Sequence, residues 1–209
     1  MKLLLVRHGQ KDKEFNSSRG HDEGLTSTGK EQARRLGLTL KNQNITHIYC
    51  SELKRAKETL QEILLSIGMI SVTYTKNINE ISRGIYSTKQ EYTQALIESG
   101  LKEHKFRPLE GENYFDVEER AGKFLDLLQK NHSSDNVLVV GHGIFLRFLM
   151  LRIQGLHMRE MAYLNLDNAS LSSFIIENGK AVFFLVNDCT HLLQYAETKQ
   201  EAPKNEVSY

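Results

Sequence analysis

The sequence predicts an α/β protein: a three-layer α/β/α sandwich around a mixed, mostly parallel sheet. Short apolar runs, typical of strands buried on both faces, alternate with amphipathic helical patterns along the chain. An Asn178-Gly179 pair between two apolar runs predicts an antiparallel hairpin near the end. The length of 209 residues is enough for one sizeable core.

Six segments are predicted to be strands. The nearly continuous apolar runs Lys2–Val6 and Val137–Val140 predict central parallel strands covered by helices. Thr46–Cys50 is a weaker candidate and Val72–Thr75 a fourth. The segments on either side of the Asn-Gly turn, 174–176 and 182–185, complete the sheet as a hairpin toward one edge.

Five segments carry helical patterns. Thr28 to Glu31 reads as a capping box at the start of the first helix, and Thr88 to Glu91 as one at the start of the third. Apolar stripes at helical spacing mark the first, second and fourth helices, and a fifth segment is apolar nearly all round, which predicts a deeply buried helix. These four patterns are Ala33, Leu36 and Leu40; Leu53 to Ile67; Tyr114 to Leu128; and Ile144 to Ile153.

Composition limits the classes of function and partner. With 27 basic and 26 acidic residues the net charge is +1, which gives no electrostatic reason to expect nucleic acid or an anionic membrane as a partner. Cys50 and Cys189 lack metal-binding spacing and suit a reducing compartment. The N-terminal apolar run is too short for a signal peptide or a membrane span. We expect a cytoplasmic protein with one domain over residues 1–195 and a polar tail over 196–209.

Charged side chains gather where two predicted strands end. Arg7, His8 and Gly9 follow the first strand, and the triplet 141–143, Gly-His-Gly, follows Val140. Ligands of open α/β sheets bind beyond the carboxyl ends of the strands, so the two imidazoles meet there if the strands are parallel neighbours. Arg55, in the first turns of the helix after the third strand, lies near the same rim. Two histidines and two arginines suit a phosphoryl group, because guanidinium groups bind its oxygens bidentately and a neutral imidazole is a nucleophile.

The same histidines and arginines also admit structural or metal-binding interpretations at this point. A single histidine after a strand is usually structural, and arginines are commonly surface charges. Zinc is a rival for the histidines, although no third ligand stands at helix or turn spacing from either. A carboxylic acid should protonate the leaving group, but spacing does not identify it among 26 acidic residues.

The chain resembles the histidine phosphatase superfamily, which also contains the cofactor-dependent phosphoglycerate mutases. The matching pieces run in family order over the chain up to about residue 193: Leu5-Val6-Arg7-His8-Gly9; Leu25-Thr26-Ser27-Thr28-Gly29; the segment 49–59 with Ser51 and Arg55; Asn79-Glu80; Glu110-Gly111-Glu112; Arg120; Gly141-His142-Gly143; Asn168-Ala169-Ser170; and Asn187-Asp188. The resemblance implies a phosphoglycerate mutase-like fold.

The resemblance also implies roles for single residues. His8 matches the nucleophile that becomes phosphohistidine, and Glu80 matches the general acid and base. Arg7, Arg55 and His142 match the phosphate pocket. The family often carries an asparagine six residues after the nucleophile, where this chain has Glu14; Asn16, two residues further on, is our candidate for that contact.

The implied activity is that of a phosphoric monoester hydrolase of the histidine acid phosphatase type, acting on a small phosphorylated metabolite without cofactor or metal. A 2,3-bisphosphoglycerate-dependent phosphoglycerate mutase is the first alternative, and a non-catalytic phosphate-binding scaffold is the second. No apolar stripe is left over from the predicted core, so the sequence leaves a homodimer open without indicating one.

Overall fold

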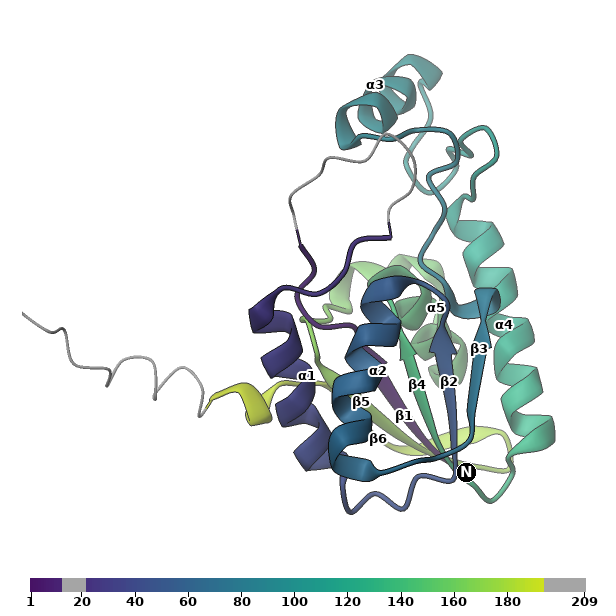
Figure 1. The fold of residues 1–209 in the computed structure, drawn as a ribbon. Helices are drawn as coiled ribbons and strands as arrows, with labels where there is room; N and C mark the ends of the chain where they lie inside the picture. The colour runs from purple at the N-terminus through teal and green to yellow at the C-terminus, as the bar shows by residue number, and fades with distance from the viewer. Residues whose placement is uncertain (13–21, 194–209) are drawn as a thin grey trace, which may run out of the picture.

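A six-stranded sheet with helices on both faces forms the body of the protein (Figure 1). The structure is a computed structural model that describes residues 1–12 and 22–193. The strand order is β3-β2-β4-β1-β5-β6. The strands are β1 (Lys2–Arg7), β2 (His47–Ser51), β3 (Val72–Thr75), β4 (Asn136–Gly141), β5 (Leu171–Glu177) and β6 (Lys180–Asp188).

The sheet is parallel in its centre and antiparallel toward one edge, as predicted. β1 pairs in parallel with β4, and the last pair in that ladder is Arg7 with Gly141. β2 pairs in parallel with β3 and β4, whereas β5 pairs antiparallel with β1 and β6. Asn178 and Gly179 both have positive φ, 50° and 77°, as a type I′ hairpin turn requires.

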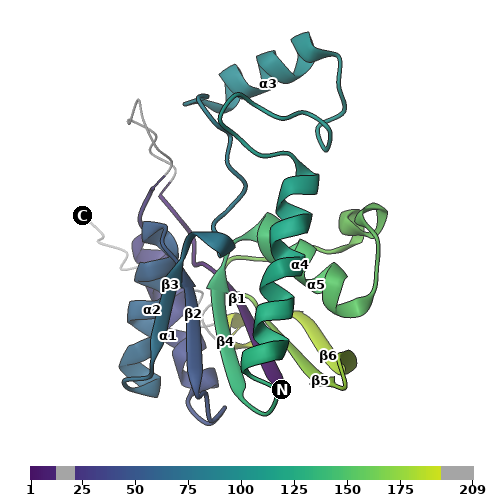
Figure 2. The ribbon, with the colours of Figure 1, turned by 90° about the vertical axis from the view of Figure 1, so that its right-hand side faces the viewer.

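Helices α1 (Ser27–Leu40) and α2 (Lys54–Ile67) cover one face of the sheet, and α4 (Tyr114–Asn131) and α5 (Gly143–Gln154) cover the other (Figure 2). Alternate residues of the central strands enter the two cores: Leu3 and Leu5 pack with α4 and α5, whereas Leu4 and Val6 pack with α1 and α2. This alternation is the pleat of a strand buried on both faces, and it confirms the three-layer prediction.

One helix start differs from the prediction. α1 is capped by Thr26, whose hydroxyl accepts the N–H of Gly29 at 2.9 Å, so the predicted capping box at Thr28 is wrong. The helix begins two residues earlier because the Thr26 side chain satisfies an N–H of the first turn, and Thr28 lies inside that turn. The capping box of α3 (Lys89–Ser99) is formed by Thr88 and Glu91, as predicted.

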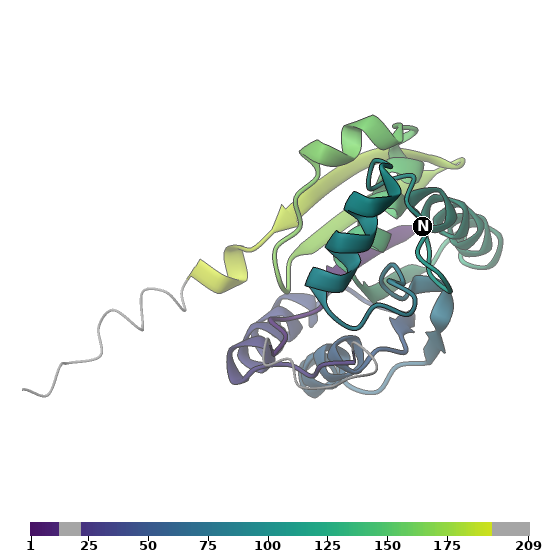
Figure 3. The ribbon, with the colours of Figure 1, turned by 90° about the horizontal axis from the view of Figure 1, so that it is seen from above.

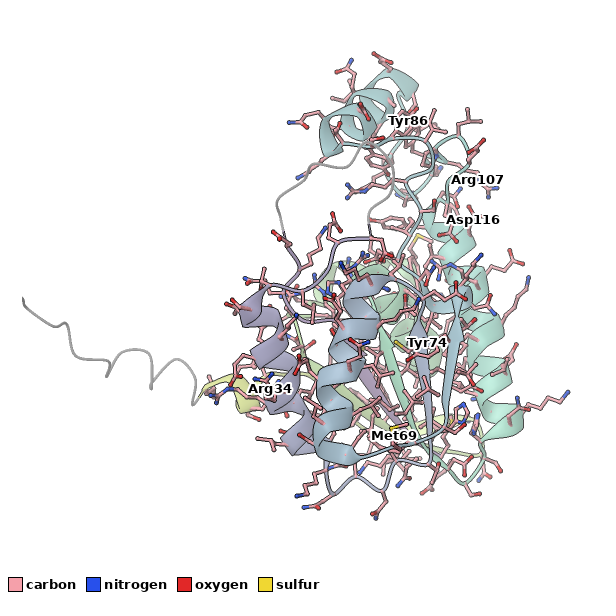
Figure 4. All side chains as sticks on the ribbon, in the orientation of Figure 1. Arg34, Met69, Tyr74, Tyr86, Arg107 and Asp116 are labelled. Carbon is pink, nitrogen blue, oxygen red and sulfur yellow. The ribbon has the colours of Figure 1, made fainter. Side chains whose placement is uncertain are left out.

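Residues 82–112, which contain α3, form a lobe beyond the carboxyl ends of the central strands (Figures 1 and 2). The chain enters the lobe after the short helix η1 (Lys76–Ile78) and leaves it at α4. The rings of Tyr92 and Phe106 pack inside it with centroids 5.6 Å apart. An ion pair between Arg107 and Asp116 joins the lobe to α4 (Figure 4).

The edge strand β6 carries apolar side chains that the core does not cover. Val182, Phe183, Phe184 and Leu185 are 46–61% exposed, so the expectation that no apolar stripe is left over is wrong. The reason is position: β6 has a neighbouring strand on one side only, and Figure 3 shows it at the outer rim of the sheet next to η2 (Met158–Tyr163). Among the described helices, none is both long and apolar enough to cross a bilayer.

Candidate active site

His8 and His142 lie side by side at the carboxyl ends of β1 and β4. Each follows the last residue of its strand, and because those strands are parallel neighbours the two rings approach to 5.2 Å between centroids. His8 is 4% exposed and His142 is fully buried. The structure thus brings together two residues that stand far apart in the sequence.

The His8 ring is held in one tautomer. Its Nδ1 lies 2.7 Å from the carbonyl oxygen of Gly9, which can only accept, so Nδ1 carries the proton and Nε2 presents a lone pair. Burial, followed by the positive charge of Arg55, lowers the pKa of His8 to about 3. The ring is therefore neutral at physiological pH, the state in which Nε2 is a nucleophile.

His142 is held by a different partner. Its Nε2 lies 2.7 Å from the hydroxyl of Ser51, at the end of β2. Its Nδ1 is buried without a hydrogen-bond partner in the described part of the chain. Burial, followed by the charge of Arg55, holds the pKa of His142 well below its usual value.

Two arginines supply positive charge beside the imidazoles. Arg55, in the first turn of α2, is 5% exposed, and Arg7 is half-buried at the end of β1. Arg7 donates to the carbonyl of Leu166, and its Nε has no hydrogen-bond partner among the residues described. Burial lowers the pKa of both guanidinium groups, although each stays positive because its ordinary value is so high.

A cavity of about 770 Å³ opens at this place. Its wall comes from β1, the start of α2, the segment around η1, the first residues of the lobe, and Arg120 of α4. The charged and polar residues of this wall include Arg7, His8, Lys11, Glu23, Arg55, Asn79, Glu80 and Asn168. His142 stands behind this wall, next to His8.

Glu80 follows η1 and faces the start of α5. Its carboxylate accepts the N–H of Ile81 at 3.0 Å and that of Ile144 at 3.2 and 3.3 Å. Ile144 is the second residue of α5, so the carboxylate sits at the positive end of a helix. Glu80 also interacts electrostatically with Arg7 and Arg55, which places it beside the proposed phosphate pocket.

Several site residues were missed by sequence reasoning. The Glu23 carboxylate lies 3.0 Å from Lys11 Nζ and 3.7 Å from an Arg55 nitrogen. Asn168 donates its amide N–H to the carbonyls of His8 and Gly9, at 3.2 and 3.3 Å. Asn168 stood in the family series without a role, and no local pattern marks Glu23. Asn16 lies outside the described residues.

The loop that carries His8 packs tightly against α1. A Cβ on Gly29 would lie 2.1 Å from the carbonyl oxygen of Gln10, and one on Gly9 would lie 2.5 Å from the carbonyl oxygen of Gly29. These distances are shorter than any real contact, so only glycine fits at both positions. In the described part of the chain, no cluster of three or more His, Cys, Asp or Glu side chains is arranged to hold a metal ion.

Known proteins match this chain over most of its length. Phosphoserine phosphatase 1 of Hydrogenobacter thermophilus is 28% identical over 205 residues, covering 93% of this chain and 96% of that protein. A Salmonella arizonae protein named "probable phosphoglycerate mutase GpmB" is 29% identical over 182 residues, covering 82% and 83%.

Solved structures share the fold. A candidate alpha-ribazole-5′-P phosphatase of Escherichia coli superposes with a TM-score of 0.80 at 26% identity, covering 90% of this chain and 97% of the other. Phosphoserine phosphatase of Entamoeba histolytica, in complex with 3-phosphoglyceric acid, gives a TM-score of 0.74 at 25% identity and covers 92% and 99%. The family model that describes the histidine phosphatase superfamily (branch 1) matches residues 3–189. With the family model spanning nearly the whole chain, the protein belongs to the histidine phosphatase superfamily.

Proposed function

We propose that the protein is a phosphomonoesterase that hydrolyses a small phosphorylated metabolite through a phosphohistidine at His8. One observation carries the proposal: a neutral, tautomer-fixed imidazole opens onto a cavity beside a second histidine, the buried guanidinium group of Arg55 and the half-buried one of Arg7. A phosphoryl dianion fits such a site, because the arginines bind its oxygens and offset the charge that develops during transfer.

The reaction runs in two steps. The His8 Nε2 lone pair attacks phosphorus, a P–N bond forms, and the P–O bond to the leaving group breaks. Glu80 gives its proton to the leaving oxygen, and His8 keeps the Nδ1 proton that it donates to Gly9. Glu80, now a carboxylate, takes a proton from water, the water oxygen attacks phosphorus, and the P–N bond breaks to release phosphate. Arg7 and Arg55 hold the non-bridging oxygens throughout.

The relatives support the class of substrate. The names of the proteins matched include phosphatases of phosphoserine and of alpha-ribazole-5′-P. The Entamoeba enzyme was crystallised with 3-phosphoglyceric acid, and a mutant of it with phosphoserine. All of these are small phosphate esters. We propose the same class for this chain and leave the individual substrate to a screen of phosphorylated metabolites.

The mutase alternative makes a distinct prediction. A mutase must keep water away from phosphohistidine, whereas a phosphatase must admit it. Incubation with 3-phosphoglycerate and a trace of 2,3-bisphosphoglycerate separates them: a phosphatase releases inorganic phosphate, and a mutase forms 2-phosphoglycerate. A non-catalytic scaffold would do neither.

We further propose a cytoplasmic protein with a single domain over residues 1–195. Cys50 and Cys189 are both free thiols, which supports a reducing compartment, and the family model spans residues 3–189. A homodimer is also a proposal, supported by the exposed apolar side chains of β6.

His8→Ala tests the proposed function. The variant should lose at least 1,000-fold in turnover of p-nitrophenyl phosphate, by order of magnitude, because nothing replaces the attacking nitrogen. His104→Ala, a half-buried histidine of the lobe outside the cavity wall, is the matched control and should keep wild-type turnover. Turnover by His8→Ala at the wild-type rate would refute the assignment.

A further inference from the structure

The side chains of Ser51 and Asn79 form a chain of hydrogen bonds behind His142. The Ser51 hydroxyl lies 2.7 Å from Asn79 Oδ1 and 2.7 Å from His142 Nε2. Ser51 and His142 are both fully buried, so water does not substitute for these bonds. The direction of each proton can therefore be worked out from the partners alone.

A backbone N–H fixes the orientation of the Asn79 side-chain amide. The N–H of Glu52 donates to the Asn79 side chain at 3.1 Å, so the atom that receives it is the amide oxygen and not the nitrogen. That oxygen only accepts, and the Ser51 hydroxyl must donate its single proton to it. The Ser51 oxygen then has two lone pairs left, and the N–H of Leu53 occupies one of them at 3.2 Å. The other accepts from His142, whose Nε2 must carry the proton.

We infer that Ser51 and Asn79 are positioning residues that lock His142 in its Nε2–H tautomer, so that an anionic ligand binds together with one proton, taken up at His142 Nδ1. In the neutral Nε2–H tautomer Nδ1 is a bare acceptor. A phosphoryl oxygen is an acceptor too, and two acceptors placed together repel. A proton between them turns this repulsion into a charge-assisted hydrogen bond.

The surroundings of His142 make the uptake depend on the ligand. The ring is fully buried among positive groups, and both conditions oppose its protonation. The groups that act on the ring electrostatically are Arg55 of α2, His8 after β1, Arg120 of α4 and Arg7 of β1. The Glu80 carboxylate accepts the N–H of Ile144, two residues along the chain from His142. A bound dianion adds two negative charges to this set and favours the imidazolium. This inference rests on the proposed phosphate site, but the tautomer can be measured without any activity.

The first experiment is ¹⁵N NMR of protein labelled at histidine, with the His142 signals identified by their loss in His142→Gln. The wild-type spectrum should contain a protonated Nε2 and an unprotonated Nδ1. Ser51→Ala should give a mixture of the two tautomers, because the acceptor for Nε2 is gone. Thr73→Ala, which removes a hydroxyl 3.0 Å from His47 Nε2 on a neighbouring strand, should leave the His142 signals unchanged. A wild-type His142 with its proton on Nδ1 would overturn the inference even if Ser51→Ala does not fold.

The second experiment measures proton uptake with sulfate, a dianion that has no proton of its own to supply. It uses His8→Ala protein, so that the other imidazole does not contribute. Sulfate affinity should fall about tenfold per pH unit between pH 6 and 8, because one proton is taken up per ion. In the Ser51→Ala, His8→Ala double variant the fall should be under about threefold per unit, since His142 can then present an Nδ1 proton already in place.

The outcomes separate the two proposals. A pH-independent sulfate affinity in the His8→Ala protein would overturn the proton uptake while leaving the phosphate site intact. Failure of sulfate to bind at any pH would count against the phosphate site itself, and so against the proposed function. The resting tautomer in the NMR spectrum would still decide whether Ser51 and Asn79 lock the ring.

Discussion

The rings of His8 and His142 lie 5.2 Å apart and are inclined by 53°. Different partners determine which nitrogen of each ring carries the proton. A backbone carbonyl fixes the proton of His8 on Nδ1, and a side-chain hydroxyl fixes that of His142 on Nε2. The two imidazoles are thereby suited to different tasks. Nε2 of His8 can attack phosphorus, and Nδ1 of His142 can take up a proton when an anionic ligand binds.

The proposed acid role of Glu80 makes a prediction about leaving groups. Glu80→Gln keeps an oxygen for the N–H of Ile144 but has no proton to transfer. The loss in kcat/KM should be about 100-fold or more for an alkyl phosphate, whose alkoxide must be protonated as it leaves, and much smaller for p-nitrophenyl phosphate. Steady-state kinetics on the two esters measures this, and an equal loss for both would count against the acid role.

Much of the fold follows from local patterns in the sequence. The apolar runs around Leu4 and Val139 predict β1 and β4 because strands buried on both faces tolerate almost no polar residues. The hairpin follows from Asn178 and Gly179, which suit the positive φ of a tight turn. Local patterns failed where a neighbouring residue competed, as at the cap of α1, where Thr26 and not Thr28 binds the free N–H.

The site could be predicted only in part. Two histidine-glycine pairs after apolar strands suggested a shared rim, and family resemblance supplied the role of Glu80. The partners Ser51 and Asn79 could not be assigned, because their bonds join segments 28 to 91 residues apart that only the folded sheet brings together. Glu23 was missed for the same reason: its contacts with Lys11 and Arg55 depend on how the loop before α1 returns to the cavity.

The depressed pKa of His8 predicts a pH-dependent stability. In the unfolded chain the ring titrates near its ordinary pKa of about 6.5, whereas in the fold its pKa is about 3. Between these values the unfolded state binds a proton that the folded state does not, so stability is lost as pH falls through this window. The slope from one such group is at most about 1.4 kcal/mol per pH unit.

Urea unfolding at several pH values checks this expectation. From pH 6 to pH 4, the free energy of unfolding should fall less steeply in His8→Gln than in the wild type. His104→Gln, which replaces a lobe histidine whose ring packs against Phe115 of α4, is the control and should follow the wild-type slope. Equal slopes for all three proteins would mean that His8 does not carry the effect.

Two of the helical glycines, Gly29 of α1 and Gly122 of α4, should respond oppositely to alanine. At Gly29 the added Cβ meets the backbone oxygen of Gln10 at 2.1 Å, so the loop that carries His8 must move. We expect Gly29→Ala to destabilise the protein by more than about 1 kcal/mol and to lower kcat/KM.

At Gly122 in α4 the nearest atom is Arg152 Nε at 3.4 Å, an ordinary contact. Gly122→Ala should therefore be neutral or stabilise by about 0.5–1 kcal/mol, with unchanged kinetics. Thermal unfolding and steady-state assays test the pair, and similar effects of both changes would argue against a close approach at Gly29.

The carboxylate of Glu23 should weaken the binding of phosphate. It lies 3.7 Å from an Arg55 nitrogen, at the guanidinium proposed to hold the phosphoryl oxygens, and it repels a dianion placed there. Lys11, 3.0 Å away on the other side, offsets part of this charge. Glu23→Gln removes the repulsion and leaves the side-chain shape, so the inhibition constant of inorganic phosphate should fall by about three- to tenfold.

Product inhibition of p-nitrophenyl phosphate turnover measures that constant. Glu62→Gln is the matched control, because Glu62 also pairs with an arginine, Arg34 at 2.9 Å, but between α1 and α2 at an exposed position outside the cavity wall. It should leave the inhibition constant unchanged. If Glu23→Gln instead weakens phosphate binding, then the carboxylate acts mainly by holding Lys11 in place, and the competition for Arg55 is minor.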